Sequence, residues 1–123
     1  MNDGSTRFTL LLLAMPAGVA DDAPASHFIV HFSSGPAWDP ARSPGEQPGF
    51  REHSANLNRL RSDGKILFGA RYDDYGMLVV KAGSADAATA LFADDPGVQS
   101  GIFEYQVAAL NVFYPWQDPA SVR

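Results

Sequence analysis

The order of its apolar segments constrains this chain more than any other feature. Four short runs are rich in β-branched and aromatic residues and are bounded by glycine, proline, serine or aspartate, which is typical of strands. They lie at residues 27–32, 65–71, 77–82 and 102–114. Residues 49–63 carry apolar side chains at the spacing of one helix face, and residues 84–93 begin with a serine that can cap a helix. This pattern predicts the order strand, helix, strand, strand, helix, strand.

That order is the split βαβ pattern of a ferredoxin-like βαββαβ domain, so the expected fold class is α+β with an antiparallel four-stranded sheet. Two helices on one face of such a sheet leave its other face uncovered. The strands are apolar at nearly every position, which indicates that both faces are buried. Pairing two sheets face to face would bury both, so we expect a homodimer that forms a dimeric α+β barrel. In the last strand we expect Phe103, Tyr105, Val107 and Ala109 to point inward. The opposite register, in which the alternate residues point inward, is equally apolar and stays an alternative.

Composition limits what the domain can be and what it can bind. A length of 123 residues allows one hydrophobic core. The formal net charge of −5 argues against nucleic-acid binding, which needs clustered lysine and arginine. Because the chain has no cysteine, it can form no disulfide, no cysteine zinc site and no thiol nucleophile. We expect no metal and no cofactor.

The first twenty residues have the character of a secretory signal. Arg7 precedes the apolar run 8–15, and small residues end the segment at Ala20. The run is too short for a stable membrane span, since a spanning helix needs roughly 20 apolar residues. The alternative is a buried N-terminal strand. With the signal, the protein is exported to the periplasm. The expected organisation is then a signal peptide at 1–20, a short linker at 21–26, the domain at 27–116 and a C-terminal tail at 117–123.

His53 is the best single candidate for chemistry. It shares a helix face with Phe50, Leu57 and Leu60, the face that packs toward the sheet. A buried imidazole needs a polar partner, and Asp95, just after the second helix, can supply one. A carboxylate bonded to one ring nitrogen leaves the other nitrogen free as a base or acid. The alternative is that the two side chains only tie the helices together.

Three other residues are candidates for binding a substrate. Asn56 lies one turn beyond His53 and can hydrogen-bond a ligand or simply face solvent. Arg71 ends a strand beside tyrosines and can hold an organic acid, or it can pair with the aspartates at 73 and 74. Trp38 lies in a proline-rich loop, residues 33–48, whose length is typical of a lid or a binding loop. Its ring either covers a pocket or anchors the loop.

His31, on the first strand, is the fourth candidate for substrate binding. It can face the same pocket, and it would then form a mixed nitrogen and oxygen metal site with His53 and Asp95. Nothing in the spacing of these residues demands a metal. A partly exposed histidine at the edge of the sheet is the simpler interpretation.

Three stretches carry a resemblance to a known family: Glu52–Leu57, Asp63–Ala70 and Ala93–Phe103. The third contains an Asp-Pro pair followed by an apolar residue and a glycine, directly after the second helix. On these motifs, residues 27–114 resemble the YCII-related (YciI-like) family. The resemblance implies a ferredoxin-like fold, a dimeric α+β barrel, and a site of one histidine and one aspartate, which fall here on His53 and Asp95. The related muconolactone isomerases act on small oxygenated rings or ring-derived acids.

These observations predict a small lyase or isomerase that needs no cofactor and acts on a small cyclic or unsaturated organic acid. His53 would move the proton, Asp95 would orient His53, and the loop 33–48 would cover the pocket. Two alternatives stay open. One is a non-catalytic module that binds a small ligand in the same pocket, and the other is a structural dimer in which the pair braces the core.

Overall fold

The computed structural model describes residues 26–117 of the chain. The predicted signal peptide at 1–20 lies outside these residues, as do nearly all of the linker and of the C-terminal tail. The strands are β1 Ser26–Ser34, β2 Ile66–Tyr72, β3 Tyr75–Ala82 and β4 Phe103–Ala109, and the helices are α2 Phe50–Ser62, α3 Ala85–Ala90 and α4 Pro96–Gln99, with a 3-10 turn η2 at Pro44–Glu46.

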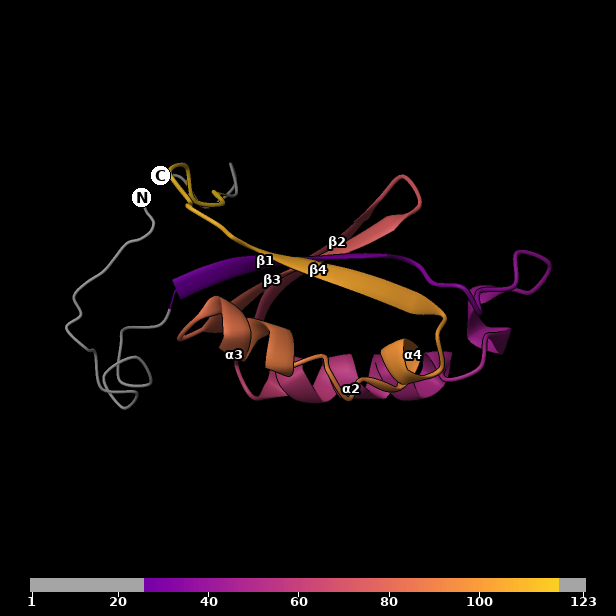
Figure 1. The fold of residues 1–123 in the computed structure, drawn as a ribbon. Helices are drawn as coiled ribbons and strands as arrows, with labels where there is room; N and C mark the ends of the chain where they lie inside the picture. The colour runs from indigo at the N-terminus through magenta and orange to yellow at the C-terminus, as the bar shows by residue number, and fades with distance from the viewer. Residues whose placement is uncertain (1–25, 118–123) are drawn as a thin grey trace, which may run out of the picture.

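The four strands form one antiparallel sheet in the order β2-β3-β1-β4. The helices α2, α3 and α4 all cover the same face of that sheet (Figure 1). The predicted α+β class and its strand and helix order are therefore confirmed, and the short helix α4 lies between α3 and the last strand. Within residues 26–117, no helix has both the length and the hydropathy that a membrane span needs.

Two elements end earlier than the sequence pattern predicts. The second helix is expected over 84–93, but α3 ends at Ala90. The N–H groups of Leu91 and Phe92 donate to the carbonyl oxygens three residues earlier, so the chain continues as tight turns and not as an α-helix. Ser84 caps α3 as expected, since its hydroxyl accepts from the Ala87 N–H at 3.0 Å. Strand β4 ends at Ala109, which pairs with Phe28 of β1, whereas the pattern predicts a strand to residue 114. One further bond follows, from the Leu110 N–H to the His27 carbonyl oxygen at 3.0 Å.

The core lies between the sheet and the helices. Val30, Val80, Phe92 and Ile102 are fully buried there. Along β4, Phe103, Tyr105 and Val107 pack against this core, so the predicted inward register holds for these three residues. Ala109, the fourth predicted inward residue, is exposed because it lies at the end of the strand.

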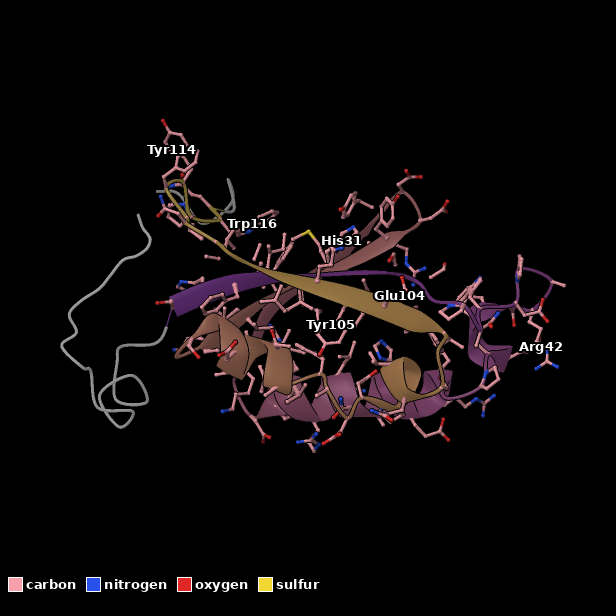
Figure 2. All side chains as sticks on the ribbon, viewed as in Figure 1. His31, Arg42, Glu104, Tyr105, Tyr114 and Trp116 are labelled. Atoms are coloured by element: carbon pink, nitrogen blue, oxygen red, sulfur yellow. The ribbon has the colours of Figure 1, made fainter. Side chains whose placement is uncertain are left out.

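No helix of the described chain covers the opposite face of the sheet (Figure 1). We call it the open face, and its side chains alternate with the buried ones along each strand. Its members include Ile29, His31, Phe68, Met77 and Val79, which the strand register places side by side. Figure 2 shows His31 pointing away from the helix layer and Tyr105 pointing toward it.

Candidate functional site

A buried histidine–aspartate pair joins helices α2 and α4. The Nδ1 atom of His53 lies 2.6 Å from Oδ2 of Asp95. The two residues are 7% and 1% exposed, so the bond forms away from bulk solvent. The structure thus brings together the two residues that were predicted as the catalytic pair, although they are 42 positions apart in the chain.

The local sequence explains why Asp95 reaches His53. Asp95 is the N-cap of α4, where its Oδ2 atom accepts from the N–H groups of Gly97 at 3.0 Å and Val98 at 3.3 Å. Pro96 starts the helix, a position where its missing N–H costs nothing. A Cβ atom on residue 97 would lie 3.1 Å from the His53 Cβ, so Gly97 permits the close approach of α4 to α2.

The surroundings of Asp95 favour its ionised form. Burial raises the pKa of the carboxyl, but hydrogen bonds from His53 and Asn56, the charge of His53 and the Gly97 N–H together hold the pKa below its usual value. An ionised carboxylate only accepts hydrogen bonds. Nδ1 of His53 therefore donates to Asp95, and whenever the ring is neutral, Nε2 keeps a lone pair that can accept a proton.

Aromatic rings hold the imidazole in place. The ring centroid of His53 lies 4.7 Å from that of Phe103, 5.6 Å from that of Phe32 and 6.2 Å from that of Phe50. Packed aromatic pairs of this kind restrict rotation of each ring. With Nδ1 bonded to Asp95, the orientation of the imidazole is set by both a polar and an apolar contact.

His53 lines a cavity of about 760 Å³, whereas Asp95 does not. The walls come from the first turns of α2, from the hairpin that joins β2 to β3, and from the loop between β1 and α2. The hairpin turns away from the helix layer (Figure 1), and residues on both of its strands line the cavity. The histidine is therefore the member of the pair that a bound molecule would meet.

The loop between β1 and α2 is held by a residue that the sequence analysis missed. Gln47 is 3% exposed, and its side-chain amide donates to the carbonyl oxygens of Asp39 at 2.7 Å and Arg42 at 3.2 Å. Its Oε1 atom accepts from the Asp39 N–H at 3.0 Å. Nothing in the local pattern distinguishes this glutamine from a solvated one. These hydrogen bonds connect two parts of the loop and fix its conformation. Trp38 and Arg42 of this loop line the cavity.

The other predicted binding residues separate into three locations. Trp38 and Arg71 line the cavity with His53, and Asp73 and Asp74 line it as well. Asn56 is not among the lining residues, and its amide donates to Oδ1 of Asp95 at 2.7 Å.

His31 lies on the open face, where its ring is 4.7 Å from that of Tyr75 and 6.0 Å from that of Tyr72. It therefore does not meet His53 and Asp95. Within residues 26–117, no three histidine, aspartate or glutamate side chains are grouped closely enough to hold a metal ion.

The comparisons with known proteins give one match. A model of the YCII-related domain matches residues 39–111, a span that covers more than half of the chain and contains both His53 and Asp95. No curated protein and no solved structure matches the chain.

Proposed function

This chain belongs to the YCII-related family. On that basis we propose that it is a small enzyme, a lyase or isomerase, that transfers a proton on a small cyclic or unsaturated organic acid. The observation that carries this proposal is the His53–Asp95 hydrogen bond of 2.6 Å beside a cavity. Of these two residues, His53 lines the cavity and Asp95 does not. This arrangement suits a general base whose partner is shielded from the ligand.

In the proposed reaction, Nε2 of His53 takes a proton from a carbon next to the carboxyl group of the substrate. The imidazolium that forms is stabilised by the ionised Asp95. In an isomerisation, the same proton returns to a different carbon of the conjugated anion. In an elimination, the electron pair instead expels a leaving group. Neither route needs an external oxidant or reductant, so proton transfer by His53 and Asp95 is sufficient for the reaction.

The lining of the cavity supports an organic acid as the ligand. Arg42 from the loop and Arg71 from the end of β2 both line it, and a guanidinium can hold a carboxylate through two parallel hydrogen bonds. Phe32, Leu57 and Phe103 give the cavity apolar surface against which a small ring can pack.

Transfer of deuterium from solvent tests the proposal directly. A panel of small cyclic and unsaturated carboxylic acids is screened for thermal stabilisation of the protein, and the acids that bind are then incubated with it in D₂O. We expect proton NMR to show exchange at the carbon next to the carboxyl group. His53→Asn should slow the exchange at least about 100-fold. His31→Asn is the matched control, because His31 lies on the opposite face of the sheet.

The outcomes separate the alternatives. Equal exchange by His53→Asn and the wild type would contradict the proposal. Stabilisation by an acid without exchange would indicate a non-catalytic binding module. If no acid binds and His53→Asn only lowers the melting temperature, the pair is a structural brace, which is a role that the capping of α4 by Asp95 also suits.

We propose in addition that the protein is a homodimer in which the open faces of two sheets pack together. Phe68, Tyr72 and Tyr75 are about half exposed in the single chain, and a second sheet would bury them. Export to the periplasm depends on residues 1–20 alone and stays a prediction.

A further inference from the structure

The geometry points to Asn56 as a positioning residue that acts on His53 through Asp95 and not through the substrate. Its kinetic consequence rests on the proposed function. The hydrogen-bond network from which it is drawn does not depend on that function. This network assigns to Asn56 a role different from the substrate contact that the sequence predicts.

The oxygen Oδ2 has three hydrogen-bond donors. They are Nδ1 of His53 at 2.6 Å and the N–H groups of Gly97 and Val98. The other oxygen, Oδ1, has one donor among residues 26–117, the amide of Asn56 at 2.7 Å. A donor on the second oxygen further restricts rotation of the carboxylate about its bond to Cβ. Asn56 therefore completes the set of contacts that keeps Oδ2 directed at His53.

Arg59 fixes which way the Asn56 amide faces. Its guanidinium donates to Oδ1 of Asn56, and a guanidinium has no acceptor atom. The amide oxygen must therefore face Arg59, and the amide nitrogen must face Asp95. His53, Asn56 and Arg59 follow one another at three-residue intervals on α2, so they share one face of that helix.

The network continues to the protein surface. Nη1 of Arg59 lies 3.9 Å from the carboxylate of Asp63, and both side chains are more than half exposed. A row of polar groups thus runs from solvent to the buried pair without passing through the cavity. Arg59 and Asn56 are outside the cavity lining, so changing either one should leave substrate contacts intact.

The chemistry predicts which kinetic constant changes. During proton transfer, the positive charge on His53 needs an ionised carboxylate directed at Nδ1. Without the Asn56 donor, the buried Oδ1 has lost its partner, and the pKa of Asp95 rises because one of the contacts that lowers it is gone. The titratable groups near this carboxylate are His53 and Tyr105 of β4, and the charged Arg59 is connected to it through Asn56. The loss should appear in kcat, with KM nearly unchanged.

The test uses Asn56→Ala, with Asn58→Ala as the matched control on the same helix, since Asn58 is exposed. Titration of the Asp95 carboxyl by carbon NMR should show a higher pKa in Asn56→Ala only. The proton on Nδ1 of His53, which a short bond shifts far downfield, should move upfield in the same variant. With an exchanging acid in hand, kcat should fall about tenfold and KM should stay within about twofold.

A second pair of variants covers the case in which Asn56→Ala fails to fold. Arg59→Ala should move the Nδ1 proton in the same direction by a smaller amount, and Arg59→Lys, which again carries only donors, should restore it. Wild-type values for the Asp95 pKa and the Nδ1 proton in Asn56→Ala, or in Arg59→Ala if the first variant does not fold, would overturn the inference. A rise in KM alone would show that Asn56 binds substrate. If the wild type turns over no acid, the proposed function fails, and the two NMR measurements still decide this inference.

Discussion

At the scale of single residues, Asp95 connects two parts of the molecule through one carboxylate. It caps α4 through the N–H groups of Gly97 and Val98 and holds Nδ1 of His53 with the same oxygen. The same oxygen therefore contributes to the stability of α4 and to the orientation of the imidazole. The ionisation of Asp95 has consequences for folding that can be measured without knowing the substrate.

Acid should destabilise the fold partly through Asp95. The pKa of this carboxyl is lower in the folded chain than in the unfolded one, so its contribution to stability is complete above about pH 4 and is lost as the pH falls through that value toward the folded pKa. Asp95→Asn should lower the free energy of unfolding by about 2–3 kcal/mol at neutral pH. Urea unfolding at a series of pH values should show the difference from the wild type shrinking in acid.

Asp94→Asn is the control for that measurement, because Asp94 is the exposed neighbour of Asp95. Its effect should be small at every pH. A difference between the wild type and Asp95→Asn that stayed constant down to strong acid would argue against an ionised carboxylate in the folded state.

At the scale of elements, the four-residue helix α4 determines whether the site exists. Its N-cap carries Asp95, and its second residue is Gly97, which packs against α2 and β4. A Cβ atom at this position would lie 2.8 Å from Cδ2 of Phe103 and 3.1 Å from Oδ2 of Asp95. The absence of a side chain at residue 97 therefore sets the distance between α4 and the imidazole.

Gly97→Ala should separate α4 from α2. We expect a loss of about 1–3 kcal/mol in the free energy of unfolding, which is the usual cost of overpacking a buried site. Gly45→Ala is the matched control, because a Cβ atom there has no neighbour within 4 Å. Denaturant unfolding of both variants measures the effect, and equal stability of the two would show that α4 shifts without cost.

At the scale of the whole molecule, the two faces of the sheet differ in what covers them. The helices bury one face, and the open face keeps partly exposed aromatic and aliphatic side chains (Figure 2). Beyond β4, Phe113, Tyr114 and Trp116 are 78%, 85% and 83% exposed, and the ring of Trp116 lies 6.0 Å from that of Phe68 on the open face. Such a surface is typical of an interface between protein chains.

Substitution on the open face tests the proposed homodimer. Light scattering should give about twice the mass of one chain for the wild type. Phe68→Asp should shift the protein toward the monomer, because it places a charge within an apolar contact. Ala87→Asp adds the same charge on exposed α3 and should not. A wild type that stays monomeric at every concentration would contradict the proposal.

Local patterns in the sequence were sufficient for most of the architecture. The β-branched and aromatic composition of the strands, the apolar spacing of α2 and the cap at Ser84 are properties of neighbouring residues, and each of these elements has the predicted type. The termination of α2 is equally local, because Gly64 has a φ of +78°, a conformation that glycine adopts at little cost. The pairing of His53 with Asp95 was also predicted, since a buried imidazole needs a partner and the family motif supplied the aspartate.

Only the tertiary structure determined which contacts each polar side chain makes. His31 and His53 look alike in the sequence, yet strand alternation and packing place them on opposite sides of the sheet. Asn56 and Gln47 look like solvated side chains, yet one completes the contacts of Asp95 and the other closes the loop beside the cavity. The physical reason is that a hydrogen bond between distant residues depends on where the backbone brings them. Short-range sequence patterns carry no information about that distance.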